Sequence, residues 1–408
     1  MRLRLLPATI LFILINDTLN HTRRKDVDDI GIVAYGHTKY GILSENTTDL
    51  LNNVISDCLK NVDKGISPKD IGMVIVSCAD NQFSNQAQTG ALALRYLGNY
   101  DAEAFRVEAA CASGSMAAYL ARKMLAAEYV DNVLVVGFEK MSRLSTEAAT
   151  SVLIRGGSPE ENQMGITQPA AYAMMAQMYM NKFGATEEDF AAVSVKNHVN
   201  ALRNPWAQFH KKIGIEDVKN SRLIASPIRL LHCSPISDGA AAILLSRKPK
   251  QFTDTPVHIK GMGLAHDTLG VFERDDPTSV VSSRKAASKA YKEADTNPKD
   301  IDAAEIHDAF TPVELMIYED LGFAEKGKGI NLIREGKVNF EGDLPINVSG
   351  GLKGKGHPIG ATGIGMMIEM YLQLRGEAGE RQLSNLNSVL LENHGGTGAT
   401  SIVTILGR

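Results

Sequence analysis

Cysteine is scarce in this chain, and neither sign of charge is in large excess. Only four of the 408 residues are cysteines (Cys58, Cys78, Cys111 and Cys233), and none of them stands in a CxxC pair. This spacing argues against a disulfide framework and against a cysteine-rich zinc site, and it fits a reducing cytoplasm. Lys and Arg number 43 against 47 Asp and Glu, a formal net charge of −4, and no basic run carries interleaved aromatic residues. A nucleic-acid partner is therefore not expected.

The apolar run near the N-terminus, residues 8–15, is too short to span a bilayer, so no membrane association is expected. It follows Pro7 and leads into Asn16-Asp17-Thr18 rather than into a small-residue cleavage site. Two interpretations stay open: a signal peptide, or an extension that reflects a start codon assigned too far upstream. We favour the second and expect residues 1–26 to be disordered, because a clean strand pattern opens at Val27.

Two parts of the chain repeat the same order of predicted elements. The tetrapeptide PKDI occurs at residues 68–71 and again at 298–301, each time between a predicted helix and a predicted strand. Both halves continue with a strand, a small-residue turn, a helix and two further strands. Alternation of this kind predicts an α/β fold with parallel strands covered by helices on both faces. We expect a first half at 27–252, interrupted by an insertion at about 143–222, and a second half at 253–408.

The insertion contains a methionine-rich segment with Met174, Met175, Met178 and Met180. Methionine side chains adapt to irregular apolar shapes, so these residues could line an acyl-binding surface. A packed helix explains the same pattern, and we favour core packing.

The stretch FRVEAACASGSMAAYLARK, residues 105–123, changes from an apolar run to a helical pattern around Cys111. A strand that enters a helix there would direct free backbone N–H groups at the sulfur, and the helix dipole would stabilise its thiolate. The small neighbours would let an acyl substrate approach closely. A buried cysteine in a small-residue packing site fits this stretch equally well, so both interpretations stay open at this point.

The corresponding turn of the second half favours the catalytic interpretation. The segment GGLKGKGHPIGATG, residues 350–363, offers His357 as a general base that could take the thiol proton. A phosphate-binding loop is excluded because the chain lacks GxxxxGK followed by Ser or Thr. Lys353 and Lys355 of this segment are expected to be exposed. Two more histidines, His307 in EIHDAF and His394 in ENHGGTG, end predicted strands, where α/β folds place ligands.

Together these stretches resemble the thiolase family, from about Val27 to the C-terminus. EAACASGSMA resembles the nucleophile motif, GGLKGKGHPIGATG the glycine-histidine-proline signature, and HGGTGATSI the C-terminal glycine-rich motif. The resemblance implies duplicated βαβαβαββ halves in a five-layered αβαβα sandwich, with an inserted loop domain. It also implies homodimers or homotetramers, and acyl transfer between coenzyme A thioesters through an acylated cysteine, without cofactor or metal.

By this resemblance Cys111 is the nucleophile, and His357 activates it and helps to hold the thioester oxygen. The N–H groups of Cys111 and Gly396 form the other oxyanion hole. The chain has His307-Asp308-Ala309-Phe310 where most thiolases have Asn-Glu-Ala-Phe, and His394 where they have a cysteine. His394 is therefore the leading candidate for the proton shuttle to the second substrate, and His307 either orients a water or supports the first oxyanion. His198 and Gly356 are expected to contact substrate.

The two departures resemble archaeal thiolases that make acetoacetyl-CoA for the mevalonate pathway. The implied activity is acetyl-CoA C-acetyltransferase, with acetyl-CoA and CoA as substrate and product. Implied partners are hydroxymethylglutaryl-CoA synthase and a small protein with a zinc ribbon and an OB fold. Two alternatives remain: a degradative 3-ketoacyl-CoA thiolase of the sterol carrier protein X type, and a non-catalytic scaffold that binds coenzyme A.

Overall fold

The computed structural model describes residues 30–408, so the extension predicted at residues 1–26 lies outside the described residues. The first half contains, in chain order, β1 (Gly31–His37), α2 (Thr47–Lys60), β2 (Met73–Ser77), α3 (Asn81–Ser84), α4 (Thr89–Leu97), β3 (Glu103–Val107), α5 (Ser113–Ala126), β4 (Asn132–Lys140) and, after a long insertion, β7 (Asp238–Ser246). The strands lie in the order β3-β2-β4-β7-β1. Every residue of β4 and β7 is buried, because helices cover both faces of the sheet.

The second half repeats this order. It contains β8 (Val257–His266), α11 (Val281–Ala294), β9 (Ala303–Ile306), α12 (Thr311–Asp320), α13 (Gly329–Arg334), α14 (Gly351–Lys355), α15 (Ile359–Arg375), β10 (Ser388–Gly395) and β11 (Thr400–Gly407). The strands continue the first sheet in the order β8-β11-β10-β9, because β1 also pairs with β8 at Ile32 and Val257. This short pairing between β1 and β8 thus joins the two sheets into one continuous sheet.

The two PKDI segments have the same conformation. Residues Pro68–Asp70 and Pro298–Asp300 each form one turn of 3₁₀ helix, and each turn leads into a parallel strand of its half, β2 or β9. The third strand is where the halves differ. In place of a second β3 the chain makes a single parallel bridge, between Ala304 and Ile346. Asn347, at φ 58°, ends the extended segment there.

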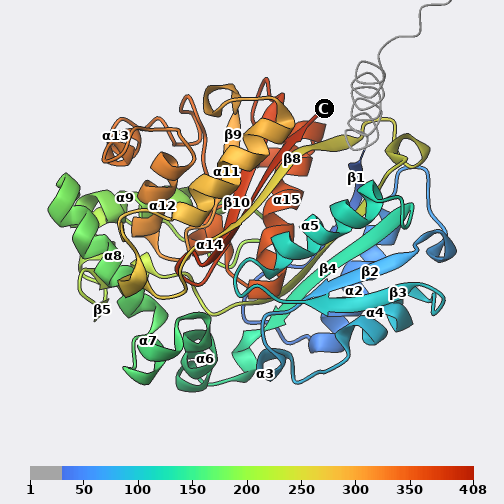
Figure 1. The fold of residues 1–408 in the computed structure, drawn as a ribbon, viewed down its shortest axis with the longest axis horizontal. Coiled ribbons are helices and arrows are strands. Elements are labelled where there is room, and N and C mark those ends of the chain that lie inside the picture. The colour runs from blue at the N-terminus through green and yellow to red at the C-terminus, as the bar shows by residue number, and fades with distance from the viewer. Residues whose placement is uncertain (1–29) are drawn as a thin grey trace, which may run out of the picture.

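Five layers follow from how the buried side chains are grouped. Helices α5 and α15 pack against each other between the two sheets (Figure 1). Their apolar residues share one core with the inner faces of both sheets, for example Ile243 of β7 and Val389 of β10. Separate cores lie under α2 and α4 on one outer face and under α11 and α12 on the other. Because α15 is in the central layer, all of its residues from Ile359 to Leu374 are buried.

The insertion between β4 and β7 is mainly helical and lies over the second half (Figure 1). It contains α6 (Thr146–Leu153), α7 (Pro159–Gln163), α8 (Gln168–Phe183), α9 (Glu187–Ala201), α10 (Ile215–Lys219), β5 (Leu223–Ala225) and β6 (Ile228–Arg229). On α8, Met175 is fully buried in the core beneath α11 and α12, whereas Met178 is 43% exposed. Among residues 30–408, none of the helices has the length and apolarity needed to cross a bilayer.

Candidate active site

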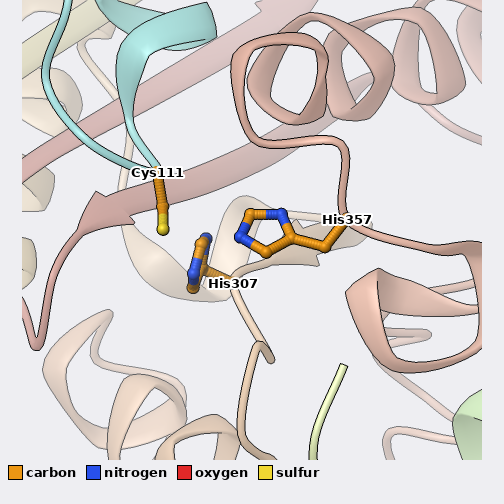
Figure 2. A group of neighbouring side chains, drawn as sticks. All are labelled: Cys111, His307 and His357. Atoms are coloured by element: carbon orange, nitrogen blue, oxygen red, sulfur yellow. The ribbon is translucent and has the colours of Figure 1, made fainter. Parts of the chain in front are cut away.

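Cys111 lies on a tight turn between β3 and the start of α5. Ala110 adopts the left-handed conformation, with φ at 48°, which is uncommon for a residue with a Cβ. The Ser113 hydroxyl holds this turn, since it accepts from the N–H of Ala109 at 2.9 Å and donates to the carbonyl of Ala110 at 2.6 Å. The turn directs the sulfur toward the second half of the chain (Figure 2).

His357 lies in the short connection between α14 and α15. The connection is fixed from two sides: Ser237 accepts the N–H of His357 at 2.9 Å, and Asp308 accepts the N–H groups of Leu352 and Lys353 at 2.6 and 3.2 Å. Glycine is required at position 351, where φ is 58° and a Cβ would lie 2.5 Å from Asp308 Oδ2.

His307 and His394 come from the ends of neighbouring strands. Strands β9 and β10 are parallel and pair Ile306 with Glu392, so the residues that follow leave the sheet at the same edge. The centroids of the two imidazole rings are 4.2 Å apart, and the His307 ring is 5.2 Å from that of His357. The strand ends and the α14–α15 connection therefore bring three histidines together.

The sulfur of Cys111 faces two of these rings. Sγ and one ring nitrogen each of His307 and His357 all lie within 4.8 Å of one another (Figure 2). Cys111 also borders a cavity of about 350 Å³, within the size range of ligand pockets. Apolar walls come from Phe83, Leu153 and Ile359, and Gly396 lies at the cavity floor beside the cysteine. A small acyl group can thus reach the sulfur.

The neighbours of His357 make its Nε2 a proton acceptor. Its Nδ1 is 2.7 Å from the hydroxyl of Thr362, which donates its own hydrogen to the carbonyl of Pro358 at 3.0 Å. Nδ1 therefore carries the ring proton, and Nε2 keeps its lone pair. Nε2 is buried and has no hydrogen-bond partner within residues 30–408. Burial, with a smaller contribution from His394, lowers the pKa of His357 to about 3, so the ring is neutral at physiological pH.

The neighbours of His307 give it the opposite tautomer. The Asn393 amide accepts from the Ser115 hydroxyl at 2.9 Å through Oδ1, so its Nδ2 is the donor that faces His307 Nδ1 at 2.9 Å. Nδ1 is thus the acceptor, and the proton is on Nε2, which finds no partner in the described part of the chain. Burial keeps the pKa of His307 well below its usual value. His307 can therefore donate a hydrogen bond to an oxyanion beside Cys111.

His394 has both ring nitrogens occupied. Nδ1 is 3.0 Å from Glu392 Oε1, and Nε2 is 2.9 Å from the hydroxyl of Tyr172, a residue of α8 in the insertion. The Tyr172 hydroxyl also donates to the carbonyl of Gly396 at 2.6 Å. His394 is fully buried. It thus lies behind His307, and Tyr172 separates its Nε2 from the remainder of the site.

The pKa of the Cys111 thiol is raised to about 12, chiefly by burial and also by the charges of Glu139 and Glu108. The N–H groups of Gly396 and of Cys111 itself lower the pKa of the thiol, but their effect is smaller than that of burial. The expected thiolate at the start of α5 is therefore not the resting form. A base is required to remove the proton, and the two N–H groups remain available for an oxyanion.

His198 and Gly356 lie along the seam between the insertion and the glycine-rich loop. His198 of α9 stacks on Phe209, and its Nδ1–H donates to the carbonyl of Lys211, 3.0 Å away. Gly356, at φ 112°, packs beside Gln208 and Ser237. The expectation that Lys353 and Lys355 are exposed is wrong, because both are buried in the same region, where Lys353 lies over the ring of Phe209.

Cys111, His307 and His357 are also the residue types that bind zinc, but their surroundings do not favour a metal. A histidine that binds a metal through one nitrogen donates its other N–H to an acceptor. His357 meets this requirement through Thr362. His307 does not, because its Nδ1 faces the amide donor of Asn393. The donor set therefore fits acyl chemistry better than a metal site.

Three residues that sequence reasoning missed complete the site. Thr362 and Asn393 stand within the quoted segments GHPIGATG and ENHGGTG, next to the histidines already selected. Strand alternation could have singled out Asn393, which points to the opposite face from Glu392 and His394 and bonds to Ser115 of the central helix α5. Tyr172 comes from the insertion, and no motif or spacing in the sequence connects it with the site.

A duplicated α/β sandwich that places a cysteine of one half against histidines of the other defines the class of this protein: it is an acyltransferase. A family model described as "Thiolase, N-terminal domain" matches residues 30–249, and one described as "Thiolase C-terminal domain-like" matches residues 263–408. The chain belongs to the thiolase family.

Relatives with established names agree with this assignment. An acetyl-CoA acetyltransferase of Methanothermobacter thermautotrophicus is 39% identical over 384 residues, which cover 93% of this chain and 100% of the relative. That of Methanocaldococcus jannaschii is 39% identical over 389 residues, 93% of this chain and 98% of the relative. Sterol carrier protein 2 of Oryctolagus cuniculus is 35% identical over 72% of this chain but only 56% of its own length.

Solved structures show the same fold. The protein described as "Ltp2-ChsH2(DUF35) aldolase" superposes with a TM-score of 0.80 at 25% identity and covers 93% of this chain and 97% of its own. Human mitochondrial 3-ketoacyl-CoA thiolase in complex with CoA superposes with a TM-score of 0.71 at 18% identity and covers 94% and 98%. The predicted thiolase fold is thereby confirmed.

Proposed function

We propose that this enzyme is an acetyl-CoA C-acetyltransferase, which condenses two molecules of acetyl-CoA reversibly to acetoacetyl-CoA and CoA through an acetylated Cys111. The observation that carries the proposal is the position of the Cys111 sulfur, which faces an acceptor nitrogen of His357 and a donor nitrogen of His307 within 4.8 Å. The names of the two archaeal relatives support acetyl-CoA as the substrate.

The first half-reaction acylates the cysteine. His357 Nε2 takes the thiol proton as the sulfur attacks the thioester carbonyl, and the same proton then goes to the departing CoA thiolate. His307 Nε2–H, with the resulting imidazolium of His357, stabilises the tetrahedral oxyanion. Such a donor contributes roughly a hundred- to a thousandfold in rate.

The second half-reaction forms the carbon–carbon bond. A base removes a proton from the methyl group of the second acetyl-CoA, and the carbanion attacks the acetyl-cysteine. The N–H groups of Cys111 and Gly396, which already point at the sulfur, stabilise the second oxyanion. The proposed base is the group formed around His394. No step needs a cofactor or a metal, and His198 and Gly356 are proposed to contact the bound thioester.

The proposal extends to the setting of the enzyme. We place it in the cytoplasm, at the entry to the mevalonate pathway, as a homodimer or homotetramer. Strand β3 ends the sheet and has partly exposed side chains, as expected of an edge that pairs with another copy. The solved aldolase neighbour contains a DUF35 component, which supports a small partner protein here too. Hydroxymethylglutaryl-CoA synthase is the proposed second partner.

A degradative 3-ketoacyl-CoA thiolase is the second candidate function, favoured by the similarity to sterol carrier protein 2. The two candidates differ in chain length. A biosynthetic enzyme should cleave acetoacetyl-CoA much faster than a long-chain 3-ketoacyl-CoA, and the opposite preference would support the degradative role.

The decisive experiment is intact-mass measurement of the purified full chain after incubation with acetyl-CoA. One acetyl adduct is expected, absent in Cys111→Ala and retained in the matched control Cys58→Ala, whose thiol is buried between α2 and the sheet. Condensation by the parent protein should proceed to a large extent only when a coupled reaction consumes the acetoacetyl-CoA. A chain that forms no adduct would be a scaffold that binds coenzyme A rather than an enzyme.

A further inference from the structure

Tyr172 is the one group of the inserted helix α8 that bonds directly to the catalytic residues. Its hydroxyl lies 2.9 Å from His394 Nε2 and 2.6 Å from the carbonyl of Gly396, the residue whose N–H points at the Cys111 sulfur. The side chain is 3% exposed, and its ring stacks on Phe310 with centroids 4.5 Å apart. The phenol is thus held in place by its hydrogen bonds and its ring stack, and Gly396 lies between it and Cys111.

Tyr172, His394 and Glu392 form a carboxylate–imidazole–hydroxyl series. Glu392 Oε1 lies 3.0 Å from His394 Nδ1, and this carboxylate is itself held by the Ser283 hydroxyl at 2.6 Å and the N–H of His307 at 3.2 Å. A carboxylate that only accepts fixes the ring proton on Nδ1 and leaves Nε2 as an acceptor, which receives the phenolic hydrogen once this hydrogen turns away from the Gly396 carbonyl, to which it is donated in this structure. This is the arrangement by which serine hydrolases activate a hydroxyl.

The phenol is the end of the series that lies nearest to the cavity at Cys111, because it bonds to Gly396, which lines that cavity. Both nitrogens of His394 are engaged and its ring is fully buried, and Glu392 lies deeper still in β10. Burial raises the pKa of Tyr172 well above its usual value, and the buried guanidinium of Arg274, held by Thr397, offsets only part of this effect, so the phenol is protonated at rest.

We propose that Tyr172 is the catalytic acid/base that exchanges a proton with the second substrate, while His394 and Glu392 act through it as positioning residues. This inference rests on the proposed acetyl-CoA condensation. In that direction the Tyr172 oxygen takes the proton from the methyl carbon of acetyl-CoA as its own proton passes to His394 Nε2. The carbon electron pair forms the new C–C bond, the C–S bond to Cys111 breaks, and the proton returns along the same path to the sulfur.

The test separates the two half-reactions in the full-length chain. Tyr172→Phe keeps the stack on Phe310 and removes only the hydroxyl. We expect the exchange of labelled CoA into acetyl-CoA, which needs only Cys111 acylation, to stay within about threefold of the parent. Condensation, thiolysis of acetoacetyl-CoA, and solvent deuterium uptake by the acetyl-CoA methyl group should each fall about a hundredfold or more, the usual effect of losing a general acid/base.

Tyr179→Phe is the matched control, because it removes another buried phenol of α8, one that bonds to Glu319 and not to the catalytic residues. It should leave both half-reactions unchanged. Equal losses of exchange and condensation in Tyr172→Phe would mean that the phenol merely positions Gly396, and no loss of condensation would mean that it takes no part; either result overturns the proposal. Absence of acetylation in the parent chain would instead refute the proposed function itself.

Discussion

The two histidines that face Cys111 are chemically identical, but their neighbours assign them opposite roles. Thr362 accepts the Nδ1 proton of His357 and leaves Nε2 as a base, whereas Asn393 donates to Nδ1 of His307 and leaves Nε2–H as a donor. In the proposed mechanism, removing a proton and stabilising an oxyanion are different tasks, and each tautomer suits one of them. The difference between the two histidines is therefore set by Thr362 and Asn393, rather than by groups that contact the sulfur.

His357→Asn should slow acetylation of Cys111 by roughly a hundred- to ten-thousandfold, because a thiol with a pKa of about 12 then has no base. Quenched-flow acetylation followed by intact-mass measurement gives the rate. His266→Asn, at a partly exposed position bonded only to Thr400, is the matched control and should change nothing.

The pH dependence of the same rate provides a second check on this assignment. The base is active when neutral, and the pKa of His357 is lowered to about 3, so the rate should stay level as the pH falls from 8 to about 5. A decline with a midpoint near pH 6.5 would contradict the buried, neutral imidazole.

The residues of the site differ in how well the sequence alone predicts their roles. Cys111, His307, His357 and His394 could be selected because motif and repeat put them at the ends of predicted strands or starts of helices. Thr362 and Asn393 lie beside them in the same motifs, but their roles depend on hydrogen-bond directions that no spacing rule encodes. The pKa of Cys111 was mispredicted because burial depends on the whole fold, whereas the helix start is local.

At the scale of elements, the site depends on how closely α5 and α15 approach. Glycines at the crossing allow this: a Cβ on Gly363 would lie 2.4 Å from Ser115 Oγ and 2.5 Å from Asn393 Oδ1. The hydrogen bond between Ser115 and Asn393 fixes the amide that sets the tautomer of His307. Helix packing and catalysis are thus connected through one small residue.

Gly363→Ala should destabilise the protein by about 1–3 kcal/mol, as overpacking usually does, although alanine favours a helix by about 1 kcal/mol over glycine. Activity should fall as well, since Asn393 is displaced. Urea unfolding and condensation assays measure the two effects. Gly214→Ala is the control, because its Cβ would have no atom nearer than 3.7 Å and its φ is −108°. Unchanged stability in Gly363→Ala would show that the helices can separate at no cost.

The sequence predicted most elements through the repeat, and the two 3₁₀ turns at PKDI confirm that the halves are equivalent. The repeat predicted a strand before the glycine-rich turn of the second half, but this strand is reduced to one bridge at Ile346. There the left-handed Asn347 turns the chain, and its side chain accepts the N–H of Ile306 at 2.8 Å in place of a continued ladder. Strand propensity does not predict that a side-chain oxygen will take the place of a backbone carbonyl as the hydrogen-bond acceptor.

At the scale of the whole molecule, enclosing the site between two halves buries many titratable groups in their neutral forms. Burial lowers the pKa of five histidines, to about 3 for His37 and His357, to about 4 for His198 and His232, and well below the usual value for His307. Burial also raises the pKa of four carboxyl groups, to about 7 for Glu139 and Asp308, and in the same direction for Glu305 and Asp320.

These two sets act on stability in opposite directions. The unfolded chain protonates the imidazoles near pH 6.5 and the folded protein does not, so their contribution to stability is lost as the pH falls below 6.5. The folded protein keeps Glu139 and Asp308 protonated up to about pH 7, and the pKa values of Glu305 and Asp320 are raised in the same direction, whereas the unfolded chain protonates carboxyls only near pH 4, so their contribution is lost as the pH rises. Between about pH 4.5 and 6.5 the two sets nearly offset each other.

The free energy of unfolding should therefore be almost level from pH 6.5 to about 5 and fall steeply below about 4.5. There these four carboxyls become protonated in both states and no longer offset the imidazoles, which still differ at about 1.4 kcal/mol per pH unit for each proton. The lowered pKa values of Asp63, Asp131 and Asp276 act in the same direction. Urea titrations at half-unit pH steps measure this curve. Glu139→Gln removes one offsetting carboxyl, so its decline should begin nearer pH 6. A parent curve that already declines steadily from pH 6.5 would mean that the buried carboxyls are ionised in the folded protein.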